Sequence, residues 1–326
     1  MHYYHIKIFL TIFLAAFLFH ACEVPADGMY KKITLERKSS MPGTGRASAV
    51  AFAINGKGYV TLGRTLKKTD LWEYNPITDT WKEKKPFPGI NRVKGIAAVV
   101  NNKAYVGLGF GGGAVIKSIF FTDFWSYDPL TDKWESLAGY PGKATDACVS
   151  FVIGTKIYVG AGYKHLTMDN AFWAYNTLNN AWEPLQPTPG EKRFGAVACS
   201  DGNKAFFGTG FRAINENDWW EYFPATDTWK QMKSMPDKGR VQGIALSVSN
   251  RFFVTTGRYF NGKLNGGKVL SDIYEYDPVT NRWYNRGGIP DGGRENAVSF
   301  VIDKKAYIGF GENDTTVLND FWSFEP

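Results

Sequence analysis

The chain has 326 residues, of which 16% are aromatic and 35 are glycine, and its formal net charge is +7. This length can hold two average domains or one large closed β-structure, and the aromatic and glycine content favours the β-structure. The positive charge is scattered and forms no run of basic residues, so the sequence excludes a nucleic-acid footprint and we expect no nucleic-acid partner.

The first residues of the chain, MHYYHIKIFLTIFLAAFLFHAC, predict an export signal. One lysine, Lys7, precedes an apolar run from Ile8 to Phe19 that is too short to span a bilayer. The segment resembles a bacterial lipoprotein signal peptide that ends at Cys22, the residue that would carry the lipid, although Phe19 and His20 depart from the usual pattern.

The export signal divides the chain into three parts. We expect residues 1–22 to be a signal peptide, residues 23–32 a short tether and residues 33–326 a single folded domain. The protein is then expected to be exported, as an outer-membrane or periplasmic lipoprotein held at the membrane through Cys22, or as a secreted protein if Cys22 is not lipidated.

Two cysteines, Cys148 and Cys199, remain after the signal. Both lie in small-residue apolar stretches, DACVSFVI and GAVACS, where a free buried thiol is the ordinary outcome. We therefore expect neither a disulfide framework nor a catalytic cysteine.

A polar corner recurs along the whole chain. The stretch NPITDTW at 75–81 returns as DPLTDKW, NTLNNAW, FPATDTW and DPVTNRW, and the tryptophans of these stretches are 53, 48, 47 and 54 residues apart. This period indicates a repeat architecture. Each unit holds a small-apolar run, a short strand such as GKGYVTLG, a variable loop, then an aromatic strand and the tryptophan strand. Four short strands joined by turns are typical of one propeller blade.

The second strand of the unit occurs six times, centred on Tyr59, Tyr105, Tyr158, Phe206, Phe253 and Tyr307. The sixth unit stops one strand short, at DFWSFEP, while ITLERKSSMP at 33–42 reads like DTWKQMKSMP at 227–236. The sequence therefore predicts an all-β, six-bladed β-propeller with four antiparallel strands per blade, closed by an N-terminal strand.

This repeat resembles the kelch repeat over residues 33–326, on the pattern of a small-apolar strand, Lys or Arg before Tyr, a glycine, and then Trp-x-Tyr-Asn/Asp-Pro-x-Thr-x-x-Trp. It departs from the family in the glycines: the paired Gly-Gly that ends the second strand is here a single glycine, as in Leu62-Gly63. The resemblance implies that the turn into the inner strand and the loop after the second strand meet at the mouth of a central channel.

Two sets of equivalent positions fall in those segments. Thirteen residues before each second-strand aromatic stands an arginine in five of six units, namely Arg46, Arg92, Arg193, Arg240 and Arg294, with Thr145 as the exception. These guanidinium groups could tie the ring together or could bind carboxylates of a ligand, and both interpretations stay open. Asp146 and Glu295 follow two of these positions and could neutralise part of the charge.

The second set directly follows the repeated glycines and varies from unit to unit: Arg64, Phe110, Tyr163, Phe211, Arg258 and Glu312. Aromatic faces mixed with arginine and an acid suit a sugar or a charged peptide, and the alternative is that they plug the channel. The loops 110–123 and 258–272 are long enough to carry binding function. We expect Ile119, Phe120 and Phe121 to form an exposed apolar tip unless a partner covers them.

Histidine content limits the possible enzymes. Kelch-like propellers include copper radical oxidases, whose copper site needs two histidines, but only His165 remains after the signal. The sequence therefore excludes a copper oxidase and argues against zinc and against serine-histidine hydrolysis, and we expect no cofactor. Six-bladed kelch-like propellers also include sialic acid mutarotases, which need neither metal nor nucleotide and whose acid-base role could here fall to Glu295, Glu312 or Asp146.

The resulting functional hypothesis is a noncatalytic kelch propeller of the bacterial cell envelope that binds a glycan, peptide or protein partner at the channel mouth. The alternative is a mutarotase-like sugar isomerase with Glu295 as the catalytic residue. The candidate ligand-binding residues are Arg46, Arg64, Arg92, Asp146, Tyr163, Arg193, Phe211, Arg240, Arg258, Arg294 and Glu312.

Overall fold

The structure is a computed structural model that describes residues 31–326 except 66–68, 112–118, 144–145, 166 and 262–265. The expected signal peptide, Cys22 and residues 23–30 of the expected tether lie outside the described residues. Within the described ranges, no helix is long and apolar enough to cross a membrane.

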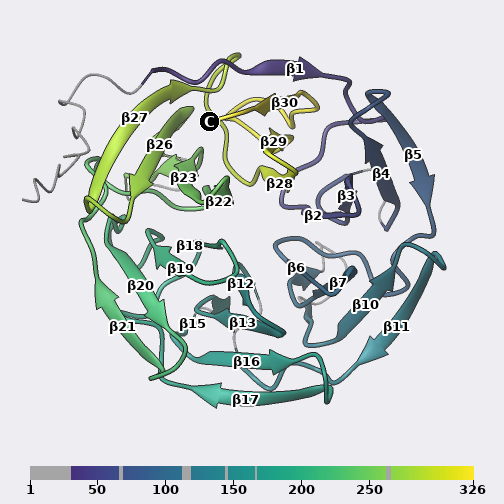
Figure 1. Cartoon of the computed structure of the whole chain (residues 1–326), viewed down its shortest axis with the longest axis horizontal. Helices are drawn as coiled ribbons and strands as arrows, with labels where there is room; N and C mark the ends of the chain where they lie inside the picture. Colours follow the sequence, from purple (N-terminus) through teal and green to yellow (C-terminus); the bar gives the residue numbers. More distant parts are fainter. Residues whose placement is uncertain (1–30, 66–68, 112–118, 144–145, 166, 262–265) are drawn as a thin grey trace, which may run out of the picture. The chain divides into compact units, whose positions relative to one another are not determined.

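Six four-stranded antiparallel sheets stand around a central channel (Figure 1). In blades 1 to 5 the first strand in chain order lies nearest the channel and the last lies on the outer wall (Figure 1). The strands of blades 1 to 3 are β2 (Val50–Ile54), β3 (Lys57–Thr61), β4 (Leu71–Asn75) and β5 (Thr80–Lys84); β6 (Ile96–Val100), β7 (Lys103–Gly107), β10 (Phe124–Asp128) and β11 (Lys133–Leu137); β12 (Val149–Ile153), β13 (Lys156–Gly160), β16 (Phe172–Asn176) and β17 (Ala181–Leu185).

The remaining blades complete the ring. Their strands are β18 (Val197–Ser200), β19 (Ala205–Gly208), β20 (Trp219–Phe223) and β21 (Thr228–Gln231); β22 (Ile244–Val248), β23 (Arg251–Thr255), β26 (Asp272–Asp277) and β27 (Arg282–Gly288); β28 (Val298–Ile302), β29 (Lys305–Gly309), β30 (Phe321–Phe324) and β1 (Glu36–Lys38). The sixth blade has the order β1-β30-β29-β28, so its outer strand comes from the N-terminal end of the described chain. The predicted six-bladed propeller and its closure are therefore confirmed.

The hydrophobic core lies between blades. Inner strands such as β2 alternate buried and half-buried residues, while second strands such as β3 are buried along most of their length. Phe52 and Tyr59 of blade 1 stack with ring centroids 5.1 Å apart, and Tyr127 of blade 2 meets Tyr59 at 6.0 Å. Because each blade buries its aromatic face against the next, closure of the ring leaves no face of the core open.

The recurring corner joins neighbouring blades. In blade 1, Asp79 adopts a left-handed φ of 52° and accepts a hydrogen bond from the Tyr74 hydroxyl at 2.7 Å. Its carboxylate also accepts the backbone N–H of Ser39 at 3.0 Å, and the indole N–H of Trp81 donates to the Ser39 carbonyl at 2.8 Å. Ser39 follows the outer strand of blade 6, so the corner is a contact between blades as well as a turn.

The same contact recurs at four further corners. The acceptors of the tyrosine hydroxyl there are Asp132, Asn180, Asp227 and Asn281. Each also accepts a backbone N–H from the end of the preceding blade's outer strand, donated by Lys85, Ala138, Gln186 and Lys233 respectively. The repeated sequence is therefore explained by a repeated contact between blades.

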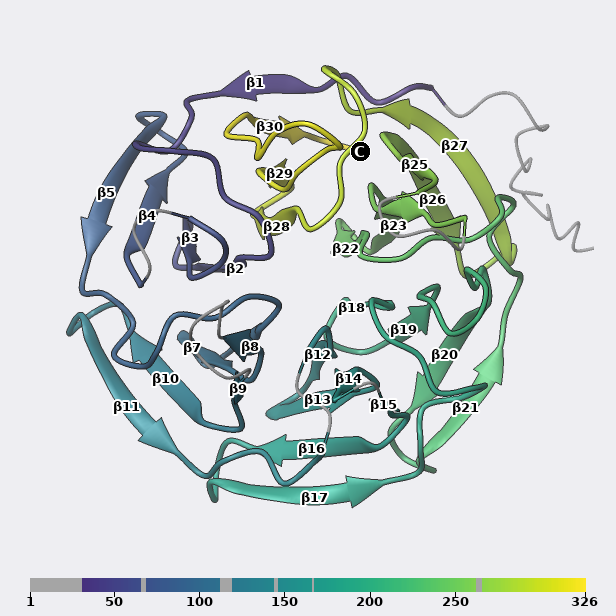
Figure 2. The same ribbon diagram turned by 180° about the vertical axis from the view of Figure 1, so that it is seen from behind.

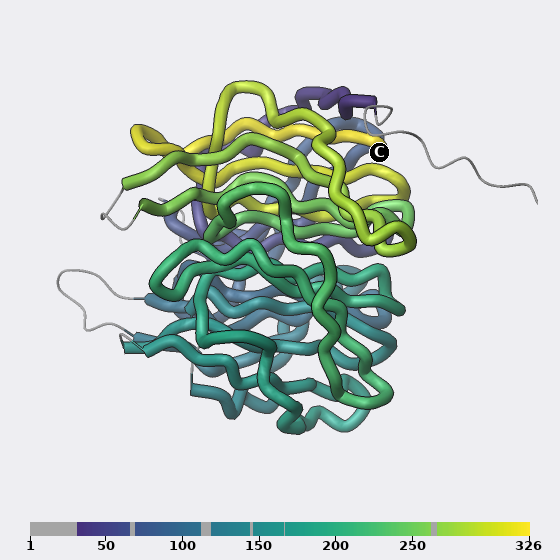
Figure 3. The backbone as a smooth tube through the Cα atoms, turned by 90° about the vertical axis from the view of Figure 1, so that its left-hand side faces the viewer, coloured from purple at the N-terminus to yellow at the C-terminus, as the bar shows by residue number. Residues whose placement is uncertain are grey.

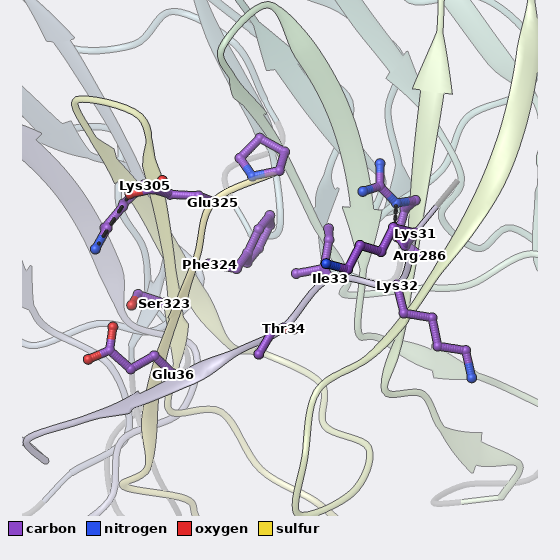
Figure 4. Close-up of a pocket in the computed structure, with 11 residues that line it drawn as sticks. Lys31, Lys32, Ile33, Thr34, Glu36, Arg286, Lys305, Ser323, Phe324 and Glu325 are labelled. Atoms are coloured by element: carbon purple, nitrogen blue, oxygen red, sulfur yellow. Dashed lines mark hydrogen bonds and ion pairs between the residues drawn. The ribbon is translucent and has the colours of Figure 1, made fainter. Parts of the chain in front are cut away.

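Blade 6 lacks this corner because its third and fourth strands come from opposite ends of the described chain. Phe324 replaces the tyrosine, and the segment before β1 attaches instead to β27: the Ile33 N–H donates to the Arg286 carbonyl at 2.8 Å, and the Arg286 side chain donates to the Lys31 carbonyl at 2.8 Å. A cavity of about 440 Å³ remains there, lined by residues that include Lys32, Phe324 and Glu325 (Figure 4).

Three small hairpins follow the second strands of blades 2, 3 and 5. They are β8 (Phe110–Gly111) with β9 (Ile119–Phe120), β14 (Tyr163–Lys164) with β15 (Thr167–Met168), and β24 (Arg258–Tyr259) with β25 (Lys268–Val269). Figure 2 shows them on the side of the ring that faces the viewer, and the edge-on view in Figure 3 shows the described parts of the blade 2 and blade 5 hairpins ending on the same side. We call this side the mouth face.

Candidate functional site

A closed belt of six backbone hydrogen bonds surrounds the channel. Each blade contributes one residue, whose N–H donates to the carbonyl of the corresponding residue in the preceding blade, at 2.8 to 3.4 Å. All of these residues have a left-handed φ between 53° and 62°. The belt residues, two positions after the arginine position, are Ser48, Lys94, Ala147, Gly195, Gln242 and Asn296.

Outside the belt, two residues of each blade form an isolated antiparallel bridge. The first directly follows the arginine position and the second directly follows the repeated glycine. The bridges join Ala47 with Arg64, Val93 with Phe110, Asp146 with Tyr163, Phe194 with Phe211, Val241 with Arg258, and Glu295 with Glu312. The backbone is thus the same in every blade, so the chemistry of the mouth depends on which side chains occupy these positions.

The repeated glycine is required by its backbone conformation and by a close approach. Gly257 has φ +92°, and a Cβ there would lie 2.8 Å from the Val241 carbonyl oxygen. The residue before it, Thr256, has φ 58°, a region that side chains other than glycine can adopt at a cost of about 1–2 kcal/mol. A side chain is therefore tolerated at the first of these two positions, whereas the glycine at the second cannot be replaced without strain.

The five repeated arginines lie beneath the mouth, at most 2% exposed. Each pairs with an aspartate of its own blade at 2.5 to 2.7 Å, in the pairs Arg46 with Asp70, Arg92 with Asp123, Arg193 with Asp218, Arg240 with Asp272 and Arg294 with Asp320. Each also donates to the carbonyl of the residue before the repeated glycine, at 2.9 to 3.3 Å. This geometry favours the structural interpretation of the repeated arginine.

Blade 3 has neither the arginine nor the aspartate of this pair. Thr145 stands at the arginine position, and Ala171 stands at the aspartate position, directly before Phe172 of β16. The joint loss of both partners is a sequence signal that the arginine pairs with an acid of its own blade, because a buried aspartate without its arginine would be an uncompensated charge.

The mouth holds a cavity of about 400 Å³ over blades 4 to 6. Among the described residues, none of the five buried arginines lines it. Its lining residues are Lys94, Phe194, Phe211, Val241, Gln242, Arg258, Phe260, Glu295, Asn296 and Glu312. Three belt residues, Lys94, Gln242 and Asn296, also line a smaller cavity of about 120 Å³ in the channel below. The cavity therefore opens directly above the belt.

One side of the cavity is charged. Arg258 donates to Glu295 at 2.8 Å and to Asp314 at 2.7 Å, and its Nη1 is buried without a partner. With the Gln242 amide oriented to satisfy both neighbours, its nitrogen donates to the second Glu295 oxygen at 2.7 Å, and its oxygen accepts from Lys94 at 2.7 Å. Four polar side chains are thus connected across the cavity floor.

Glu312 is held in the same way as Glu295. Asn296 donates to one of its oxygens at 2.9 Å, and Arg64 forms an ion pair with the other. Both oxygens of Glu295 and both oxygens of Glu312 therefore already have a partner.

Another part of the cavity lining is aromatic. Phe194 and Phe211 have ring centroids 5.9 Å apart, and Phe211 and Phe260 meet edge to face at 4.9 Å. All three side chains are half-buried. Asn215 fixes the Phe260 backbone by accepting its N–H at 3.0 Å and donating to its carbonyl at 2.5 Å. The cavity thus combines apolar rings with a set of charged donors and acceptors in one lining.

The predicted site residues are distributed over the mouth face. Phe211, Arg258, Glu295 and Glu312 line the cavity, and Arg64 reaches Glu312 from blade 1. Tyr163 and Asp146 lie in blade 3, outside the cavity lining. One Asp146 oxygen is buried without a partner, and burial raises the pKa of this carboxyl against the opposing effect of Lys94.

Sequence reasoning missed several residues that line the cavity. These are Phe194, which directly follows an arginine position, the belt residues Lys94, Gln242 and Asn296, and the loop residues Val241 and Phe260. A signal was present, because the two positions after each arginine vary between blades in the same way as the position after each glycine.

Two smaller expectations can be compared with the structure. Neither Cys148 nor Cys199 forms a disulfide bond within the described residues, and Cys199 is buried. The apolar tip is different from the expectation: Phe121 is only 8% exposed, because its ring packs against the Arg92 guanidinium at 4.0 Å, and Ile119 is 37% exposed. The prediction of an exposed three-residue tip was therefore wrong for Phe121.

Fold and site together define the class, a six-bladed β-propeller with a ligand-sized cavity at its channel mouth. No family model matches the chain, and no curated protein matches it. Among solved structures, that of YjhT has a TM-score of 0.76 and 19% sequence identity, and the match covers 87% of this chain and 96% of that chain. At this identity the likeness shows the fold alone.

Proposed function

We propose that this protein is a noncatalytic binding propeller whose ligand is a glycan held in the mouth cavity. The observation that carries the proposal is the pairing of Phe194, Phe211 and Phe260 with a charged wall of Arg258, Glu295 and Glu312 across one cavity. A sugar ring has an apolar face and hydroxyl groups that both donate and accept, so it can use both walls at once.

Size favours a glycan over a protein partner. A cavity of about 400 Å³ is within the range of small-molecule sites, whereas a stable protein interface buries roughly 800 Å² on each side. The charged wall contains both donors and acceptors, and this mixture matches hydroxyl groups better than a single carboxylate or ammonium. A peptide or protein partner is the other outcome of a binding screen.

Mutarotase-like chemistry is the second candidate, because an acid, Glu295, and an arginine, Arg258, lie 2.8 Å apart in the same cavity. Acid-base catalysis needs a group that can reach the substrate and exchange a proton with it. Each oxygen of Glu295 and of Glu312 already accepts a hydrogen bond or ion pair from the protein, which favours binding over chemistry.

The repeat itself supports a kelch-type assignment, which we include in the proposal. The corner motif and the glycine after the second strand recur in the blades, and the one departure, a single glycine in place of two, falls where a side chain is tolerated.

We further propose that the propeller is exported and anchored through lipid on Cys22. Radiolabelled palmitate should enter the wild-type chain in a bacterial host but not the Cys22→Ala variant; equal labelling of both would contradict the anchor.

Binding is tested by saturation-transfer NMR of the purified protein against a panel of mono- and oligosaccharides. At least one glycan should bind, and Phe211→Ala and Arg258→Lys should each weaken it by about ten-fold or more, because each removes a wall contact. Ile77→Ala is the matched control, since Ile77 is 88% exposed at a corner and lines no part of the cavity. Binding of no glycan, or binding unchanged in both variants, would contradict the proposal.

Catalysis is tested by adding freshly dissolved N-acetylneuraminate to the purified protein and following anomer interconversion in proton NMR spectra. We expect the anomers to interconvert at the same rate with the protein as in the protein-free control. Faster interconversion that is lost in Glu295→Gln would establish the mutarotase candidate in place of the noncatalytic one.

A further inference from the structure

We infer that the mouth binds an extended glycan, with one sugar residue in the cavity and the following residues along an aromatic row that leaves the cavity toward blades 3 and 2. This inference rests on the proposed function and adds the length and direction of the ligand to it.

The row begins inside the cavity and continues outside it. From Phe260 it passes to Phe211 and Phe194, and then to Tyr163 of blade 3, whose ring centroid is 5.6 Å from that of Phe194. Tyr163 is half-buried and is not part of the cavity lining. The first aromatic contact beyond the cavity is therefore already in place.

The hairpin that carries Tyr163 extends the row to blade 2. Tyr163 lies in β14, and His165 follows at the turn, where its ring meets Phe120 of the β8–β9 hairpin at 4.5 Å. Phe120 in turn contacts Phe110 at 5.2 Å. Two sets of aromatic contacts thus lie on the mouth face, one from Phe260 to Tyr163 and one from His165 to Phe110, and the hairpin that carries Tyr163 connects them.

The opposite direction is closed to such a ligand. In blades 6 and 1 the equivalent positions carry Glu312 and Arg64, which form an ion pair with each other, and Asp314 pairs with Arg258 beside them. An apolar sugar face gains nothing there, whereas half-buried aromatic side chains contribute strongly to binding interfaces. Among the described residues, the aromatic side chains that continue from the cavity lie toward blades 3 and 2, and this asymmetry gives the ligand a direction.

The experiment uses the full chain on a glycan array that carries each sugar as a monosaccharide and as its linear di-, tri- and tetrasaccharide. For the sugars that bind, affinity should rise by about five-fold or more from the monosaccharide to the trisaccharide, since each added aromatic contact is a substantial part of a binding energy. Tyr163→Ala should remove most of this rise, and Phe211→Ala should weaken binding at every length. Leu178→Ala, at an exposed corner of the same blade as Tyr163, is the control and should match the wild type.

The outcomes separate this inference from the proposed function. If no sugar binds at any length, the proposed function fails and the inference fails with it. If sugars bind with the same affinity at every length, or if Tyr163→Ala leaves the length dependence unchanged, glycan binding stands and the extended ligand is overturned.

Discussion

The backbone N–H of Gly257 in blade 5 donates a hydrogen bond of 2.7 Å to the carbonyl oxygen of Arg294 in blade 6. Equivalent bonds join Gly63 to Arg92, Gly162 to Arg193, Gly210 to Arg240, and Gly311 to Arg46. The backbone of each arginine thus holds the preceding blade, while its side chain holds its own blade.

A side chain at this glycine should therefore destabilise the ring. We expect Gly257→Ala to lower the free energy of unfolding by about 2–4 kcal/mol, from the left-handed conformation together with the displaced Val241 carbonyl. Gly56→Ala is the matched control, because Gly56 also has a positive φ, +71°, but a Cβ there meets no atom within 4 Å. Urea unfolding of both variants measures the difference, and equal losses would contradict the close-approach argument.

The buried arginine pairs should contribute to stability rather than bind ligand. Arg294→Ala leaves Asp320 without its partner, and we expect a loss of about 3–5 kcal/mol in the free energy of unfolding. The double variant Arg294→Thr/Asp320→Ala reproduces the composition of blade 3 and should lose less than the single variant, because no charge is left unpaired. A stable Arg294→Ala protein that has lost only glycan binding would instead support the ligand interpretation of these arginines.

The same pairs should make stability dependent on pH. Burial by itself would raise the pKa of Asp123 and of Asp320, but hydrogen bonds and charge from Arg92 and Arg294 outweigh it and lower both pKa values. A carboxyl whose pKa is lowered by folding stabilises the protein at pH values above its pKa in the unfolded chain, which is about 3.9 for aspartate. This contribution is lost as the pH falls through the pKa of the folded state.

Melting temperature measured from pH 7 to pH 2 should therefore decline below about pH 4. The decline should be shallower in Asp320→Asn, which begins less stable and has one such group fewer. An equally steep decline in that variant would show that Asp320 is not one of the groups responsible.

Closure by β1 should be needed for a cooperative ring. A chain that begins at Met41 lacks β1 and the Ser39 contacts with Asp79 and Trp81, so we expect its melting temperature to fall by at least about 10 °C relative to a chain that begins at Lys31. Differential scanning calorimetry compares the two chains. An unchanged transition would mean that the other blades hold the ring without this strand.

The fold could be predicted because its signals are local and repeated. The corner needs a left-handed Asp or Asn and a tryptophan, the second strand needs a terminal glycine, and the strand at 33–42 resembles the outer strand of another blade. Each of these features acts within a few residues and recurs in unit after unit, so the sequence by itself determined the strand order, the number of blades and the closure of the ring.

The site depends on which way the side chains at equivalent positions point, and the repeated sequence does not specify this. Arg240 and Arg258 are equally plausible ligand-binding arginines by sequence, yet Arg240 is fully buried and paired with Asp272, while Arg258 lines the cavity. Lys94, Gln242 and Glu295 come from three blades and meet only because the ring closes. Tertiary structure alone decided which repeated side chains reach the cavity, because that depends on contacts between blades far apart in the sequence.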